Sequence, residues 1–145
     1  MTHHASIRTL CAAALVIAGA FACSSTPTGV AALAGRYELR TVNGRAVPVD
    51  ALGGALSGEI RLTADGRVTR VVQHATSGIP GPIVLRAAGT YRVRGSQITL
   101  TLTNERRTPR ASRWEMIGEV ERSLLVLRYP GRSELPVEER YARVP

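Results

Sequence analysis

Few side chains in this protein could do acid–base or nucleophilic chemistry. Once a 22-residue leader is set aside, His74 is the one histidine and Cys23 the one cysteine. No cluster of His, Cys, Asp and Glu has the ligand spacing of a zinc site. A Ser-His-Asp triad through His74 would lack the strand-turn-helix context of a nucleophile. We therefore expect no catalytic residue, no metal ligand and no cofactor, and we expect that the protein is not an enzyme.

The remaining carboxylates and glycines give no other reactive site. Glu115, Glu119 and Glu121 alternate with Trp114 and Met116, which places the carboxylates on the outer side of a strand rather than in a cleft. No glycine-rich phosphate loop precedes a helix, and no nucleic-acid-binding motif occurs. The pattern excludes nucleic acid as an expected partner.

Three ionisable residues break the apolar pattern and form the core of the candidate site. Arg70 and His74 share a strand face with Val68 and Val72, and Glu139 shares one with Val137. In one interpretation they line a lumen, and Arg70 anchors the carboxylate or headgroup of an apolar ligand. In the other, a β-bulge near Arg70 turns the strand and Glu139 lies at the rim, which avoids burying charge.

The aromatic residues extend this candidate site. All five of the mature chain fall on expected inward faces, where they either fill a core or line a cavity. The candidate ligand-binding residues are therefore Arg70, His74, Tyr91, Trp114 and Glu139.

The N-terminal residues have the pattern of an export signal. Arg8 precedes an uncharged stretch from Leu10 to Ala22, and small residues precede Cys23. This stretch is shorter than the roughly 20 residues that a spanning helix needs. The pattern predicts a signal peptide at 1–22, with Cys23 either lipidated as a membrane anchor or left as a free thiol after simple cleavage and secretion.

Three regions follow from this prediction. We expect a signal helix at 1–22, a lipidated, flexible tether at 23–33, and a β-barrel domain at 34–145. Ser24 after the modified cysteine resembles signals for the outer membrane, so the expected location is the cell envelope, anchored to the outer membrane and facing the periplasm.

The chain is basic. It carries 19 Arg and no Lys against 11 acidic residues, for a formal net charge of +8. This charge either decorates loops or contacts an anionic surface.

Hydrophobic alternation predicts an all-β domain. Period-two patterns occupy eight stretches of the chain, at 36–41, 59–63, 67–74, 83–94, 97–103, 114–121, 125–129 and 135–141. Short turns join most of these stretches, and closure would remove exposed edges. We therefore predict an eight-stranded antiparallel up-and-down barrel, with a two-sheet sandwich as the alternative.

Several short motifs resemble one bacterial family. They are Gly35-Arg36-Tyr37-Glu38-Leu39, Val42-Asn43-Gly44, Leu62-Thr63-Ala64-Asp65-Gly66, Gly89-Thr90-Tyr91 and Tyr141-Ala142-Arg143. Together they resemble the small bacterial lipocalin-like lipoproteins, although Tyr37 stands where lipocalins proper carry Trp. The resemblance implies an envelope barrel and a hydrophobic ligand, and it brings no catalytic residues.

Two hypotheses of function follow. The first is a non-enzymatic envelope lipoprotein that binds a small apolar or amphiphilic molecule in its barrel. The second is a solid barrel that serves as a structural or interaction module and contacts an envelope protein or an anionic surface. The first predicts a cavity and the second predicts none.

Overall fold

The computed structural model describes residues 29–49, 54–76, 78, 80–105, 113–130 and 135–145. In this part of the chain one short helix, α1 (Val30–Leu33), precedes the strands. The strands are β1 (Gly35–Val42), β2 (Arg45–Ala46), β3 (Ala55–Leu62), β4 (Arg67–His74), β5 (Ile83–Arg94), β6 (Gln97–Asn104), β7 (Arg113–Glu121), β8 (Leu124–Pro130) and β9 (Pro136–Val144). The predicted all-β class is confirmed.

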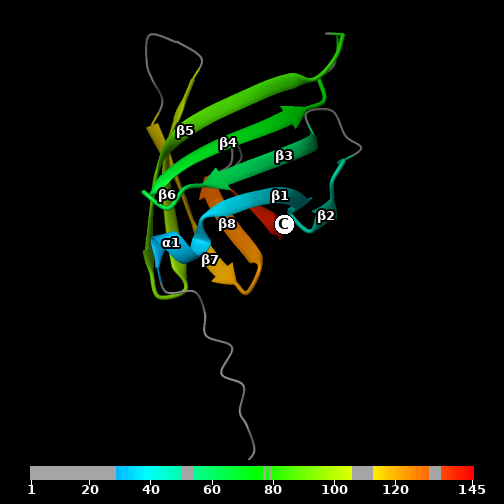
Figure 1. Cartoon of the computed structure of the whole chain (residues 1–145). Helices are drawn as coiled ribbons and strands as arrows, with labels where there is room; N and C mark the ends of the chain where they lie inside the picture. The colour runs from blue at the N-terminus through cyan, green and yellow to red at the C-terminus, as the bar shows by residue number, and fades with distance from the viewer. Residues whose placement is uncertain (1–28, 50–53, 77, 79, 106–112, 131–134) are drawn as a thin grey trace, which may run out of the picture.

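The strands close into a barrel (Figure 1). Each strand from β3 to β9 pairs antiparallel with the next, β1 pairs with β3, and a β1–β9 pairing closes the ring of eight. The two-residue strand β2 is an addition to the prediction and pairs with β1 through Thr41↔Ala46 and Val42↔Arg45. The prediction of an eight-stranded up-and-down barrel is confirmed, and the sandwich alternative is wrong.

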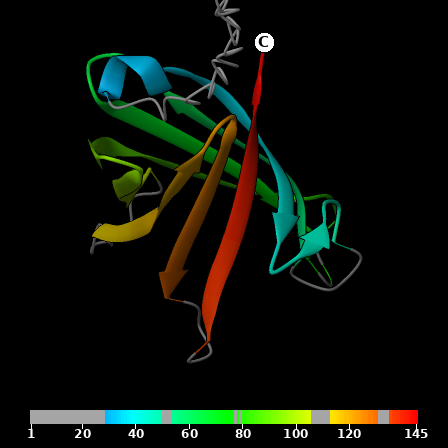
Figure 2. The same cartoon turned by 90° about the horizontal axis from the view of Figure 1, so that it is seen from below.

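The two ends of the barrel differ in their connections. Tight turns at 63–66, 95–96 and 122–123 join strands at one end, which we call the closed end. The connections 47–54, 75–82, 105–112 and 131–135 all join strand ends at the opposite, open end. Helix α1 and the C-terminal end of β9 both lie at the closed end (Figure 2).

Helix α1 belongs to the folded domain rather than to a tether. Leu33 is 1% exposed and packs in the core. The hydroxyl of Tyr37 donates a hydrogen bond to the backbone carbonyl of Leu33 at 2.9 Å. The predicted tether of 23–33 is therefore too long at its C-terminal end. Burying one leucine over the closed end fixes the last residues of this segment. The signal peptide at 1–22 and Cys23 lie outside the described residues.

The irregularities of the ladder lie away from Arg70. Strand β4 keeps one register along β5 from Arg67↔Thr90 to His74↔Ile83, so the bulge expected near Arg70 is absent from this pairing. The register shifts instead between Ala55 and Ser57 of β3 and between Leu39 and Thr41 of β1. The interpretation with a β-bulge near Arg70 was wrong. Arg70 stays on the inner face, where Glu139 neutralises its charge.

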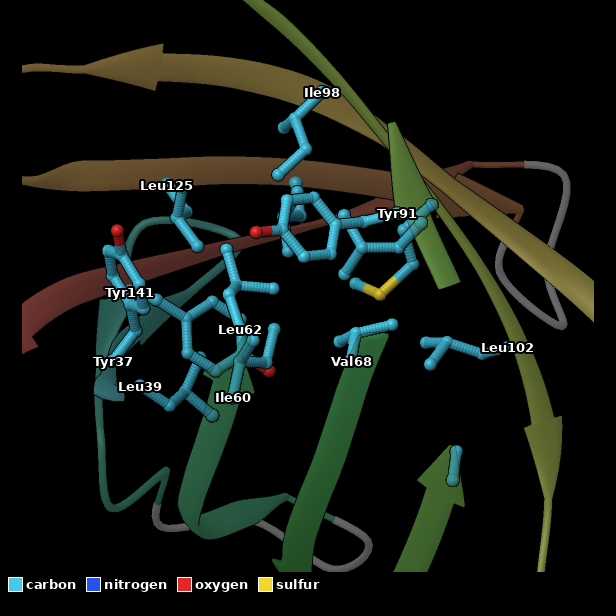
Figure 3. Packing of buried hydrophobic residues seen from close by; sticks show 14 of the residues in the cluster. Tyr37, Leu39, Ile60, Leu62, Val68, Tyr91, Ile98, Leu102, Leu125 and Tyr141 are labelled. Carbon is cyan, nitrogen blue, oxygen red and sulfur yellow. The ribbon is translucent and has the colours of Figure 1, made fainter. Parts of the chain in front are cut away.

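The closed half of the lumen is filled by side chains. Tyr37, Tyr91 and Tyr141 point inward among leucines, isoleucines and valines (Figure 3). Tyr141, Ile60, Leu100, Leu125 and Leu127 have no exposed surface. The expected inward faces of these strands are thus confirmed.

Two glycines allow neighbouring strands to approach closely. A Cβ added at Gly89 of β5 would overlap the carbonyl oxygen of Thr101, and one added at Gly118 of β7 would overlap that of Val126. Glycine inside a strand otherwise costs about 0.5–1 kcal/mol relative to alanine. The two glycines therefore let the backbone of the neighbouring strand lie where a Cβ would otherwise be.

We expect Gly89→Ala and Gly118→Ala each to destabilise the fold by about 1–3 kcal/mol, because the neighbouring backbone must move. Gly29→Ala is the matched control. A Cβ there meets nothing within 4 Å, and the cost should stay below about 1 kcal/mol. Urea denaturation of the three variants tests this, and a strand variant as stable as wild type would contradict the close approach.

Candidate functional site

The most unusual feature of the lumen is a buried ion pair. Arg70 of β4 and Glu139 of β9 are 5% and 1% exposed, and Nη2 of Arg70 lies 2.5 Å from Oε1 of Glu139. Because β1 and β3 separate these strands in the wall, the pair reaches across the lumen. Burying either charge alone would cost several kcal/mol.

Two tyrosines complete the coordination of this pair. The hydroxyl of Tyr129 donates to Oε1 of Glu139 at 3.0 Å, and that of Tyr141 donates to Oε2 at 2.6 Å. Nε of Arg70 in turn donates to the Tyr141 hydroxyl at 3.2 Å. Both oxygens of the carboxylate therefore accept hydrogen bonds, which is what a buried carboxylate requires.

Aromatic rings cover the guanidinium. Its carbon lies 5.4 Å from the ring centroid of Trp114 and 5.8 Å from that of Tyr129, within the range of cation–π attraction. The two rings meet edge to face at 5.4 Å. Nε1 of Trp114 is buried and has no hydrogen-bond partner among the described residues. We name Arg70, Trp114, Tyr129, Glu139 and Tyr141 the polar cluster.

The polar cluster holds its groups in one ionisation state. Burial raises the pKa of Tyr141 well above its ordinary value, and it raises the pKa of Tyr129 too, helped by the charge of Glu139. Burial lowers the pKa of the Arg70 guanidinium, but its electrostatic interactions with Tyr141 and Glu139 outweigh this effect and raise that pKa overall. Both tyrosines thus stay protonated donors at neutral pH.

This geometry decides between the two interpretations of the ionisable residues. Arg70 points inward, as the lumen interpretation requires, and Glu139 is buried rather than at the rim. However, the charge of Arg70 is already neutralised by Glu139. A ligand carboxylate would have to lie beside the Glu139 carboxylate, which repels it. The cluster therefore suits an uncharged group better than an anion.

The structure brings together Arg70, Trp114 and Glu139 of the candidate residues and places the other two elsewhere. Tyr91 lies at the closed end, with its hydroxyl 2.7 Å from the Val30 carbonyl and 2.8 Å from the Thr63 carbonyl. His74 is half-buried at the open end of β4, in register with Ala55 and Ile83.

Sequence reasoning did not assign Tyr129 and Tyr141 to the site. The available signal was the spacing of Tyr141 two residues after Glu139, which puts both on one face of β9. The partnership with Tyr129 depends on the alignment of β8 and β9.

Apolar side chains remain exposed above the polar cluster. Leu85 pairs in register with Val72, which is fully buried, so both point to the inner face. Leu85 is nevertheless 41% exposed. Trp114 and Tyr129 are half-buried on the facing strands. These three side chains therefore leave apolar surface exposed toward the open end.

Two hollows lie on the outer wall. One of about 280 Å³ is polar, and its lining includes Arg92, Arg94 and Arg113 of β5 and β7. The other, of about 580 Å³, lies where β1 separates from β3, and Val47, Leu56 and Val71 contribute apolar surface to it. Neither is lined by a residue of the polar cluster.

Among the residues that the structure describes, no group of three or more His, Cys, Asp or Glu could hold a metal ion. No helix in the same residues is long and apolar enough to cross a membrane.

Comparison of the chain with models of known protein families and with curated proteins finds no match. The lipocalin-like resemblance of the short motifs therefore stays a prediction, and the geometry of the barrel is the basis for assigning a function.

We expect Arg70→Leu to cost about 3–5 kcal/mol of unfolding free energy, because it leaves the Glu139 carboxylate buried without its cation. Combining it with Glu139→Leu should recover about half of this loss or more. Arg128→Leu, which removes an exposed partner of Glu138, is the control and should cost less than about 1 kcal/mol. Equal losses from Arg70→Leu and Arg128→Leu in urea denaturation would contradict the role of the pair.

The tyrosine pKa values predict alkaline destabilisation. The ordinary pKa of tyrosine is 10.0, and the folded state raises it for Tyr129 and Tyr141. Above about pH 10 the unfolded chain binds fewer protons than the folded one, so stability falls as pH rises. This contribution is fully present below about pH 10. Urea denaturation from about pH 8 to 11.5 should show a shallower fall for Tyr129→Phe than for wild type, and parallel curves would contradict the assignment.

Proposed function

We propose that this protein is a non-enzymatic lipoprotein of the cell envelope that binds part of a small apolar or amphiphilic molecule at the open end of its barrel. The observation that carries the proposal is the exposure of Leu85. An inward-facing leucine that stays 41% exposed is a side chain that a ligand can cover.

The chemistry around Leu85 defines the class of ligand. Trp114 and Tyr129 lie against the guanidinium of Arg70, and Glu139 neutralises its charge. Leu85 lies on the neighbouring strand, two positions closer to the open end than the residue paired with Arg70, and adds exposed apolar surface. An apolar chain with an uncharged polar group, such as a hydroxyl, ester or amide, fits this arrangement. A fatty-acid carboxylate fits it less well, because Glu139 already neutralises the buried charge of Arg70.

The proposal places the protein in the envelope through its N-terminus. The predicted signal peptide and small residues before Cys23 support lipidation of that cysteine as a membrane anchor. Plain secretion after cleavage at Ala22 is the alternative.

A second candidate function is a solid interaction module. The filled closed half of the lumen and the outer hollow lined by Arg92, Arg94 and Arg113 favour it, because that hollow is a basic surface. This hypothesis predicts that the protein binds an envelope partner, that salt weakens this binding, and that no ligand lies within the barrel.

A neutral fluorescent amphiphile, N-phenyl-1-naphthylamine, tests the first function on the full processed chain. We expect saturable binding that Leu85→Arg weakens about tenfold or more, because it replaces apolar contact with a charge. Ile117→Arg is the matched control. Ile117 is 49% exposed and points outward on β7. The affinity of the Ile117→Arg variant for the fluorescent amphiphile should therefore stay within about twofold of wild type.

Two results would contradict ligand binding at the open end. One is equal weakening by both arginine substitutions. The other is absence of saturable binding by a wild-type chain that melts cooperatively, which would favour the interaction module. Native mass spectrometry of the protein from a bacterial envelope, followed by lipid extraction, identifies the class of any stoichiometric ligand.

A further inference from the structure

The N-terminal segment is fixed to the closed end of the barrel by donors from three strands. Tyr91 donates toward the Val30 carbonyl, and Tyr37 donates to the Leu33 carbonyl. Arg143 donates to the carbonyls of Ala34 at 2.6 Å and Ala32 at 3.3 Å. A membrane anchor that precedes this segment in the chain is therefore connected to the closed end of the barrel.

The distance from the proposed anchor to this end is short. Six residue steps separate Cys23 from Gly29, and they span at most about 20 Å. A strand of eight residues rises about 26 Å, so the open end lies roughly one barrel length further from the anchor. A lipid on Cys23 thus keeps the closed end nearer to the membrane.

The rim of the closed end carries cations suited to such a surface. Arg61, Arg94 and Arg122 are exposed there and form no ion pair among the described residues. Other charges of this rim already have partners, since Arg36 pairs with Glu38 and Glu59, and Arg67 pairs with Asp65. The carboxylates Glu119 and Glu121 also lie at this end, on β7.

We propose that the closed end of the barrel rests on the anionic phospholipid surface of the anchoring membrane, with Arg61, Arg94 and Arg122 against headgroup phosphates and the open end directed away. This inference rests on the lipid anchor of the proposed function. Arginines near an anionic surface are attracted to it electrostatically, and this attraction falls off within a Debye length. A ligand of the open end is then exchanged with the aqueous side or with a facing partner, rather than drawn from the anchoring bilayer.

Position-specific quenching tests this orientation in the acylated full chain. Acylation consumes the thiol of Cys23, so Ser96→Cys, Glu115→Cys and Glu105→Cys each provide one thiol, at the closed end, the side wall and the open end. Each is labelled with a bimane dye in vesicles of phosphatidylethanolamine, phosphatidylglycerol and a headgroup spin-labelled lipid. We expect the Ser96 probe to be quenched several-fold more than the Glu105 probe, with the Glu115 probe between them.

Two triple variants test the role of the arginines. Replacing Arg61, Arg94 and Arg122 with serine should reduce the quenching of the Ser96 probe by about half or more. The matched triple replaces Arg45, Arg86 and Arg113, which are exposed on strands β2, β5 and β7, and it removes the same charge. It should leave the quenching of the Ser96 probe unchanged, and the closed-end effect should fade at high salt.

The outcomes separate failure of the orientation from failure of the anchor. An acylated chain whose Glu105 probe is quenched as strongly as its Ser96 probe overturns the orientation, and so does one whose Glu115 probe is quenched most. Equal effects of the two triples overturn the role of the arginines. A chain whose N-terminal peptide lacks the acyl mass contradicts the anchor of the proposed function.

Discussion

The rest of the barrel is arranged around one constraint, which is that a cation and an anion inside a small lumen must meet. Arg70 and Glu139 lie on strands that two others separate, so their contact fixes opposite walls relative to each other. A slip of one residue in β4 or β9 would turn one charge outward and leave the other buried without a partner. The pair therefore opposes alternative registers.

The polar cluster explains why the lumen is filled with tyrosines rather than phenylalanines at these points. A buried carboxylate needs more hydrogen bonds than one guanidinium supplies, and Tyr129 and Tyr141 provide them. The same hydroxyl chemistry recurs at the closed end, where Tyr37 and Tyr91 satisfy the carbonyls of the N-terminal segment. Each tyrosine thus contributes both apolar bulk and one donor.

The two ends of the barrel are built differently. Tight turns and the buried side chain of Leu33 cover the closed end. The N-terminal segment of the chain also enters the barrel at this end. The other end keeps Leu85 exposed close to a neutralised ion pair. The proposed anchor at the closed end and the proposed binding surface at the open end are compatible, because neither uses the residues of the other.

The sequence alone predicted the strands and their faces, because side chains alternate across a strand with a period of two. The short turns favoured a closed barrel over a sandwich, because they leave few ways to connect neighbouring strands. It also identified Arg70, His74 and Glu139 as exceptions to the apolar pattern and Trp114 as a further candidate for the site. Only the tertiary structure decided that Arg70 and Glu139 are partners, that Tyr129 and Tyr141 complete them, and that Leu33 is buried. These contacts join residues about 70 positions apart or depend on chain closure, which local patterns do not encode.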